Sequence, residues 1–310
     1  MARRLAPSKH RRMSQTLIHR LPFDAPAMLE YWRRDPHDAV DVVEGAMYRR
    51  VVALNGNRAA LELRLEDGVI ALRCAAWERA PRSSERAALR EVAAHMVGAN
   101  VDLAAFARAV AGDPTMAALE RRFGGVKVPQ TPTPFDALLW AILGQQITTA
   151  LAHTLKRRLA TTYGEPMLVR GTARSALPSP ERLAALDPEA LGAIGTTRAK
   201  SRAIVEAARA VVDGSLDLEA IARLETEALI AQLCKLRGVG RWTAEYVAMR
   251  GFARTDSLPA GDVALQRAAG IAYGKRYADP DGLRRLAKRW SGWESYATFY
   301  LWRTLSKPAG

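Results

Sequence analysis

Hydrophobic and polar residues alternate along the N-terminal part of the chain, from about residue 15 to residue 77. The alternation is clearest in Tyr48–Leu54 (YRRVVAL) and Ala59–Leu65 (AALELRL), and a shorter apolar run follows at Val69–Cys74. The Asn55-Gly56-Asn57 sequence between the first two runs is a strong signal for a hairpin turn. This pattern is typical of an antiparallel sheet with one buried face, so we predict a small β meander.

The period changes to about 3.6 residues after Pro81 and keeps that value to the end of the chain. A short helix is also expected ahead of the meander, at Pro26–Arg34. Helices separated by Pro, Ser and Asp are predicted at Ser84–Val97, Leu103–Ala111, Pro134–Tyr163, Pro180–Leu186, Pro188–Ala193, Ala199–Val212, Leu218–Arg223, Thr226–Lys235, Arg241–Phe252 and Gly282–Thr304.

The two patterns together predict an α+β fold that is mainly α. We expect a basic tail at 1–14, a β-rich N-terminal subdomain at 15–98 and a helical region at 99–310, with a helix-hairpin-helix at 226–252. No apolar run approaches the roughly 18 residues that span a bilayer, so no membrane association is expected.

The net charge of +14, from 46 Lys and Arg against 32 Asp and Glu, favours a polyanionic partner such as nucleic acid. Scattered solvated arginines would give the same total.

Cys74 and Cys234 are the only cysteines, which excludes a disulfide framework and a four-cysteine iron–sulfur cluster. The five histidines lack the spacing of a zinc site. A cytoplasmic location is expected, with nucleoid association in a bacterium. An organelle-targeting role for the acid-free tail is the alternative.

The most specific segment runs from Cys234 to Arg267. Gly238-Val239-Gly240 predicts a tight hairpin between two helices, the second of which begins at Arg241. Unpaired N–H groups and the helix dipole at such a helix start favour an anion, for example a DNA phosphate. An ordinary helix–helix turn is the alternative interpretation of a short glycine motif.

Aromatic and acidic residues follow this hairpin. Trp242 and Tyr246 lie four positions apart and therefore share a helix face. Asp262 comes 16 residues after Tyr246, directly before Val263, and is placed to cap the next helix. Hydrogen bonds from helix N–H groups favour an ionised carboxylate, which is the group that a sugar cation needs beside it.

With these motifs, the chain resembles the helix-hairpin-helix DNA glycosylase superfamily, and within it the DNA-3-methyladenine glycosylase II branch. The resemblance extends over nearly the whole chain. It includes Tyr31–Arg50, Phe135–Tyr163, Leu183–Val211 and Arg289–Arg303. It implies an N-terminal subdomain like that of TATA-binding protein, ahead of two helical subdomains that flank a cleft.

The resemblance also implies roles for individual residues. Asp262 matches the catalytic carboxylate. The base pocket is assigned to Trp242, Tyr246, Trp302, Gln145 and Tyr31. DNA contacts are assigned to Gly238, Val239, Gly240, Arg241, Thr243 and Gln146, the last as the wedge that fills the gap left by a flipped base. A structural monovalent cation would bind the main-chain carbonyls of Cys234, Leu236 and Val239. No other cofactor is required.

The expected reaction is hydrolysis of the N-glycosidic bond of an alkylated base in duplex DNA, leaving an abasic site. The lysine that forms a Schiff base in bifunctional relatives is replaced by Trp242, which predicts a monofunctional enzyme. One active site needs only a monomer. A bifunctional glycosylase-lyase for oxidised purines and a non-catalytic DNA-binding module are the alternatives.

Overall fold

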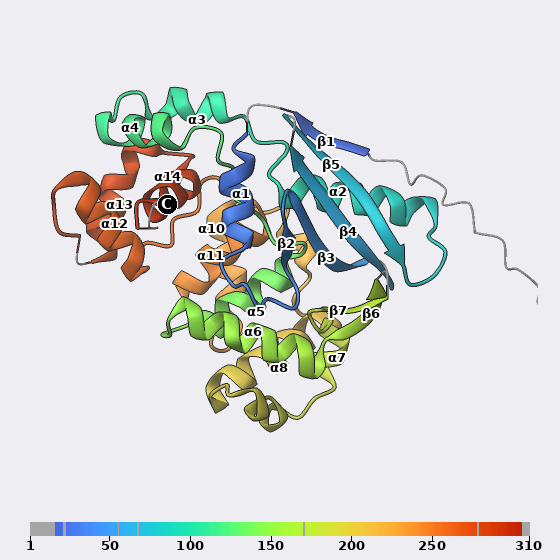
Figure 1. The fold of residues 1–310 in the computed structure, drawn as a ribbon. Helices are drawn as coiled ribbons and strands as arrows, with labels where there is room; N and C mark the ends of the chain where they lie inside the picture. Colours follow the sequence, from blue (N-terminus) through green and yellow to red (C-terminus); the bar gives the residue numbers. More distant parts are fainter. Residues whose placement is uncertain are drawn as a thin grey trace, which may run out of the picture.

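The computed structural model describes residues 16–20, 23–54, 56–66, 68–169, 171–277 and 279–305. The predicted basic tail at 1–14 lies outside these residues. A β-rich unit and a larger helical body lie against each other (Figure 1). Within the described residues, no helix has both the length and the apolar character needed to cross a bilayer.

The N-terminal unit is built on an antiparallel sheet with the strand order β1-β5-β4-β3-β2. The strands are β1 (Thr16–Arg20), β2 (Val42–Glu44), β3 (Met47–Leu54), β4 (Asn57–Glu66) and β5 (Val69–Trp77). Leu54 pairs with Asn57 across the predicted turn, so the meander is confirmed. Leu61, Leu63 and Leu65 of β4 are all buried, because alternate residues of the strand face the core.

Two helices complete this unit. Helix α1 (Ala25–Trp32) begins at Asp24, whose side chain accepts a hydrogen bond from the Ala27 N–H. Helix α2 (Ser83–Met96) packs on the sheet through Leu89, Ala93 and Met96. Helix α1 ends just before Arg33, and the loop that follows it passes close to the helical body before it enters β2 (Figure 1).

The helical body has two cores. The first is formed mainly by α5 (Pro134–Gly144), α6 (Thr149–Tyr163), α7 (Pro180–Ala184), the 3-10 turn Pro188–Ile194, α8 (Arg198–Val212), α9 (Leu218–Ile221), α10 (Thr226–Leu233) and α11 (Arg241–Gly251). The second is formed mainly by α3 (Leu103–Val110), α4 (Pro114–Phe123), α12 (Val263–Tyr273), α13 (Pro280–Ala287), the 3-10 turn Lys288–Trp290 and α14 (Glu294–Arg303). The α+β fold with a predominantly helical body is therefore confirmed.

Two predicted helices are wrong in extent. The span predicted at Pro134–Tyr163 is broken between Gly144 and Thr149, because Gln146 has a φ of 55° and the Thr148 side chain caps a new helix. The span predicted at Gly282–Thr304 is likewise two helices, α13 and α14, separated near Gly292. Gly292 has a φ of 85°, which a continuous α-helix does not allow.

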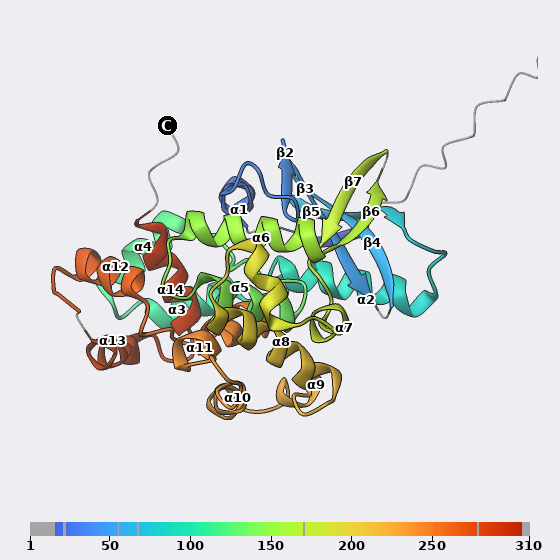
Figure 2. The ribbon, with the colours of Figure 1, turned by 90° about the horizontal axis from the view of Figure 1, so that it is seen from below.

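A second hairpin, formed by β6 (Glu165–Val169) and β7 (Thr172–Ala176), and helix α4 were not predicted. The hairpin lies beside the main sheet and next to α6 and α7 (Figure 2). Met167, Val169 and Ala176 pack there against Val51 and Ala60 of the sheet. These short runs bury their side chains against residues about 100 positions away, so their own sequence carries little signal.

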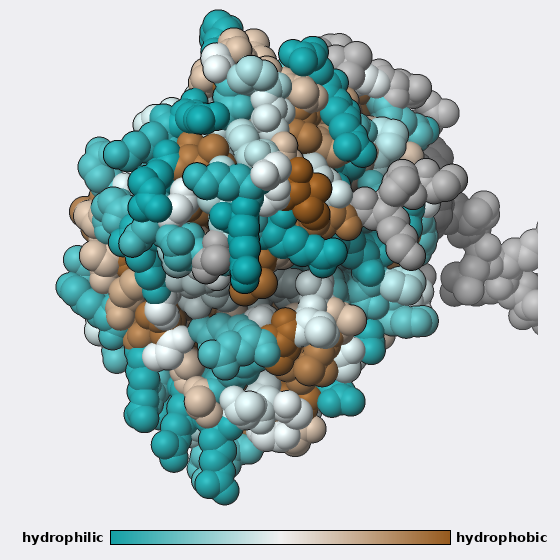
Figure 3. Space-filling view, turned by 90° about the vertical axis from the view of Figure 1, so that its left-hand side faces the viewer, coloured by the Kyte–Doolittle hydropathy of each residue, from teal (hydrophilic) through white to brown (hydrophobic). Residues whose placement is uncertain are grey.

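The molecular surface in Figure 3 is mainly hydrophilic, and its apolar side chains form separate patches. Among the described residues, the large apolar side chains that are exposed are Leu151, Leu168, Val212, Val263 and Ile271. Val263 and Ile271 both lie on α12 (Val263–Tyr273), and the other three come from separate parts of the sequence.

Candidate active site

Asp262 stands at the N-terminus of α12, as predicted. Its Oδ1 accepts a hydrogen bond from the Leu265 N–H at 2.7 Å. The side chain is half-buried. A short loop that contains Pro259 and Gly261 carries it to this point after α11. The cap therefore fixes the direction of the carboxylate.

Two tryptophans from different helices hold the same carboxylate. The indole N–H of Trp242 on α11 donates to Oδ2 at 3.2 Å, and that of Trp302 on α14 donates to Oδ1 at 3.1 Å. No cationic side chain pairs with Asp262 within the described part of the chain. Its negative charge is thus oriented by neutral donors and is not neutralised by an ion pair.

Tyr246 lies between these tryptophans. Its ring centroid is 5.9 Å from that of Trp242 and 6.4 Å from that of Trp302. The structure therefore brings together three of the five residues assigned to the base pocket, next to the assigned catalytic carboxylate.

Tyr31 reaches the same region from α1 through Arg250. The Arg250 guanidinium donates from one nitrogen to the hydroxyls of both Tyr31 and Tyr246, in the latter case at 3.2 Å. Its Nε donates to the carbonyl of Pro129 at 2.6 Å. Arg34 lies over the Tyr31 ring, 3.7 Å from its centroid. Arg250, which the sequence analysis missed, fixes the two tyrosines.

A cavity lies next to Tyr246, where its hydroxyl group meets Arg250 and Tyr31. It has an empty volume of about 680 Å³ and lies between the N-terminal unit and helices α5, α6 and α11. Tyr31, Tyr246 and Arg250 line one wall of it, and Trp140 and Leu143 belong to another.

The predicted hairpin connects α10 to α11. Gly238 has a φ of 76°, and a Cβ atom on it would lie 2.8 Å from Cβ of Ala203, so the turn needs glycine here. Gly240 caps α11 without a side-chain hydrogen bond and has open space beside it. The side chain of Arg241 is committed to Glu227 and Glu245, both at 2.7–2.8 Å. It is the main chain at this helix start that stays open to an anion.

The residues assigned to the cation lie in the same turn. Cys234 is the C-cap of α10, Val239 is buried, and the Leu236 carbonyl accepts the Val239 N–H at 3.1 Å.

Gln145 and Gln146 lie in the loop between α5 and α6, not in a helix as predicted. Gln145 is half-buried and donates from Nε2 to the Gly238 carbonyl and to Oγ1 of Thr243, both at 2.9 Å. Gln146 is exposed. Gln145 was assigned to the base pocket, and the structure places it as a bridge between the Gln146 loop and the hairpin.

We expect Gln145→Ala to weaken binding to duplex DNA about threefold to tenfold, since it removes two hydrogen bonds that join the two loops. Fluorescence anisotropy at fixed salt measures this change. The Gln232→Ala protein is the control, because the Gln232 side chain accepts from the exposed Lys235 at 2.8 Å and joins no two loops. Equal affinities of the two variants would contradict a bridging role.

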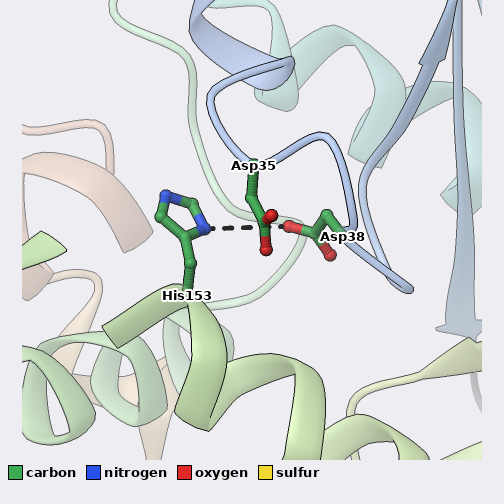
Figure 4. Close-up of side chains that lie close together, drawn as sticks. All are labelled: Asp35, Asp38 and His153. Carbon is green, nitrogen blue, oxygen red and sulfur yellow. Dashed lines mark ion pairs between the residues drawn. The ribbon is translucent and has the colours of Figure 1, made fainter. Parts of the chain in front are cut away.

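A cluster that the sequence analysis missed joins the loop after α1 to α6 (Figure 4). Ligand atoms of Asp35, Asp38 and His153 lie within 4.8 Å of one another, close enough to hold a metal ion. However, Asp35 pairs with Arg157 at 3.0 Å and Asp38 pairs with Lys156 at 2.7 Å. Cations of the chain already neutralise both carboxylates, so we interpret the cluster as an ion-pair network.

The network continues inward from Lys156. Asp41 accepts from Arg50 at 2.7 Å and also pairs with Lys156, and Arg50 reaches Asp136 on α5 at 2.7 Å. Burial raises the pKa of Asp41, but Arg50 and Lys156 outweigh it and hold that pKa well below its usual value. Burial raises the pKa of Asp136 even though Arg50 is beside it. These charges fix the N-terminal unit to α5 and α6.

His153 gives the network a pH dependence. Burial, followed by the positive charges of Arg34 and Lys156, lowers the pKa of His153 to about 4. The unfolded chain then binds this proton more tightly than the folded protein. The stability due to neutral His153 is therefore complete above about pH 6.5 and is lost as the pH falls toward about 4.

When the pH falls from about 6.5 to about 4, the free energy of unfolding should decrease in both the unchanged protein and the His153→Gln protein. The decrease should be about 1–2 kcal/mol smaller in His153→Gln, a range that allows for solvent screening. Urea unfolding at several pH values measures this difference. The matched control is His37→Gln, since His37 is exposed. A His153→Gln profile parallel to that of the unchanged protein would refute the assignment.

Comparison with known proteins bears on this site. Residues 139–294 match the family described as HhH-GPD superfamily base excision DNA repair protein, and residues 14–132 match the AlkA N-terminal domain. The chain is 29% identical over 297 residues to DNA-3-methyladenine glycosylase of Bacillus subtilis (strain 168), which covers 94% of this chain and 98% of that protein. It is 35% identical over 181 residues to DNA-3-methyladenine glycosylase 2 of Escherichia coli (strain K12), covering 58% of this chain and 61% of that protein.

A similar fold is found in the 3-methyladenine DNA glycosylase of Archaeoglobus fulgidus. The TM-score is 0.81, the identity is 24%, and the match covers 95% of this chain and 99% of that one. The first family match alone includes half of the chain and contains the hairpin and Asp262. The chain therefore belongs to the HhH-GPD superfamily of base excision DNA repair proteins.

Proposed function

We propose that this protein is a monofunctional DNA glycosylase that removes alkylated bases of the 3-methyladenine type from duplex DNA. The observation that carries the proposal is the Asp262 carboxylate, held by the indoles of Trp242 and Trp302 and by a helix N–H. The relatives named as DNA-3-methyladenine glycosylases support the substrate class.

Asp262 would act on the sugar. As the N-glycosidic bond breaks, positive charge develops on the deoxyribose, and an ionised carboxylate beside it lowers the energy of that state. Its hydrogen bonds come from neutral donors, so they orient the charge without cancelling it. The carboxylate also accepts a proton from the water that attacks the anomeric carbon. An alkylated purine leaves as a neutral base, so no second carboxyl group is needed.

DNA binding is proposed for the hairpin and for the loop between α5 and α6. The open main chain at Gly240 and the start of α11 suits a phosphate. Gln146, exposed and with a left-handed backbone, is proposed to occupy the space of the flipped nucleotide. Such a backbone costs about 1 kcal/mol or more in a residue other than glycine, and it persists where a function requires it.

A structural monovalent cation at this hairpin is part of the proposal. The main-chain carbonyls of Cys234, Leu236 and Val239 fit it, because within the described residues only the Leu236 carbonyl accepts a hydrogen bond, and a carbonyl has a second lone pair. The cation would reduce the repulsion between these carbonyls and a DNA phosphate. No other cofactor is proposed, and we propose a monomer that works in the cytoplasm or on the nucleoid.

The reaction type follows from Trp242, which offers no amine to the sugar. Lys235, the nearest lysine in the sequence, is exposed and donates to Gln232 at 2.8 Å. The test is to incubate the protein with methylated DNA, separate the released bases by chromatography and repeat the reaction with borohydride. We expect 3-methyladenine among the products, intact strands with abasic sites, and no covalent complex. A trapped complex would indicate a lyase, and DNA binding without base release would indicate a binding module.

A further inference from the structure

We propose that Tyr31 is a specificity-determining residue, whose hydroxyl donates a hydrogen bond to the carbonyl oxygen of a flipped, uncharged purine. Such a base would occupy the cavity beyond Tyr246. The proposal rests on the proposed glycosylase function and extends it to uncharged oxopurines. It depends on how Arg250 arranges the polar wall of the cavity.

Arg250 occupies the acceptor side of both phenol oxygens. It donates to the hydroxyls of Tyr31 and Tyr246, and a guanidinium cannot accept a hydrogen bond in return. Neither hydroxyl proton has an acceptor within the described part of the chain, and both residues line the cavity. Tyr31 is half-buried and faces the cavity, so a ligand there can accept its hydroxyl proton in place of water.

The faces of these rings are already occupied by cations of the chain. Arg34 lies 3.7 Å from the Tyr31 centroid, while Arg250 lies 4.9 Å from that of Tyr31 and 5.7 Å from that of Tyr246. A cationic base on this wall would meet like charge at close range. By contrast, no cation of the described residues lies over Trp242 or Trp302. The tryptophans are the side of the site suited to a cationic base, and the tyrosine wall suits an uncharged one.

Gln130 adds an acceptor to the same cavity. It is 95% buried, its Nε2 donates to the Val128 carbonyl at 3.0 Å, and its Oε1 has no donor among the described residues. A purine with a carbonyl group at position six carries a ring N–H next to that oxygen. The Tyr31 hydroxyl is the kind of donor, and the buried Gln130 Oε1 the kind of acceptor, that such an edge requires.

The hydrogen bond from Tyr31 would help an uncharged base to leave. When the bond between C1′ and the base breaks, the electron pair stays on the base, which becomes an anion unless it began as a cation. Donation to the carbonyl oxygen stabilises that negative charge. Tyr31 keeps its proton, water adds to C1′ and loses a proton to Asp262, and the base takes a proton from solvent. Burial raises the pKa of Tyr31, but Arg250 and Arg34 outweigh it and lower that pKa, which strengthens the donor.

The test compares two lesions in duplex DNA. Hypoxanthine is uncharged with a carbonyl group at position six, and 3-methyladenine is cationic with an amino group there. Tyr31→Phe keeps the ring and removes the hydroxyl. We expect it to lower the ratio of kcat/KM for hypoxanthine to that for 3-methyladenine about tenfold. Tyr296→Phe is the control, because it also removes one tyrosine hydroxyl, but from a buried residue of the second core that does not line the cavity.

The outcomes separate this proposal from the proposed function. A ratio changed less than twofold by Tyr31→Phe, or no hypoxanthine release by the unchanged protein, overturns the role of Tyr31. If the unchanged protein releases no 3-methyladenine, the proposed function itself is overturned. If Tyr31→Phe folds poorly, quenching of tryptophan fluorescence by free hypoxanthine is measured on its folded fraction. Unchanged affinity for the free base there also refutes the proposal.

Discussion

The Asp262→Asn protein is expected to bind duplex DNA but to release 3-methyladenine about a thousandfold more slowly than the unchanged protein. A carboxylate about 4 Å from a developing sugar cation contributes about 4 kcal/mol at an effective dielectric constant of about 20. That energy corresponds to a factor of about a thousand in rate. Loss of one negative charge near the phosphates leaves DNA affinity equal or slightly higher.

Single-turnover release from methylated DNA measures the rate, and fluorescence anisotropy at fixed salt measures binding. Asp113→Asn is a closely matched control. Asp113 also caps a helix, and it also accepts an indole N–H, from Trp290 at 3.2 Å. It lies in the second core and is buried. We expect that variant to lose stability and to keep base release. Release by Asp262→Asn within tenfold of the unchanged protein would remove Asp262 from the mechanism.

The role of Asp262 illustrates what the sequence can predict. The helix cap is a local property, and the sequence around Val263 was sufficient to predict it. Trp242 was predicted to share a face with Tyr246, since residues four positions apart lie on the same side of a helix. Donation from Trp242 and Trp302 to one carboxylate is different, because these residues lie 20 and 40 positions from Asp262. Only the resemblance to a known family connected them.

Contacts between distant segments explain what was missed. The ion pairs that fix the N-terminal unit to α5 and α6 join residues 86 to 122 positions apart. Their charges look like ordinary surface charges in the sequence. The break at Gln146 was missed for a related reason: the apolar residues on both sides continue the helical period, while the hairpin that holds Gln145 comes 93 positions later.

The Arg50→Met protein is expected to lose about 3–5 kcal/mol of unfolding free energy, because it leaves buried carboxylates without their cation. The Arg50 side chain is only 6% exposed and pairs with both Asp41 and Asp136 at 2.7 Å. Asp41 retains Lys156, whereas Asp136 has no other ion pair in the described residues. Its pKa, already raised by burial, would rise further, so the loss should grow as the pH increases from about 5 to 8.

Urea unfolding at both pH values measures the loss, and two further variants identify its cause. Adding Asp136→Asn to Arg50→Met should restore part of the stability, since an amide carries no charge to leave unpaired. Arg108→Met is the control, because Arg108 and Asp102 are 71% and 61% exposed, and its effect should stay within about 0.5 kcal/mol. A loss in Arg50→Met that is as small as in Arg108→Met would contradict the prediction.

The Arg50 ion pairs touch no substrate, but they hold the elements that carry active-site residues in place. Arg50 joins strand β3 to helix α5, and α5 leads into the loop that carries Gln145 and Gln146. On the other side of the cavity, the N-terminal unit carries Tyr31. Loosening this joint should therefore change the tyrosine wall more than the Asp262 end of the site, which is held by α11, α12 and α14. At a temperature where Arg50→Met is still folded, its release of hypoxanthine should fall more than its release of 3-methyladenine.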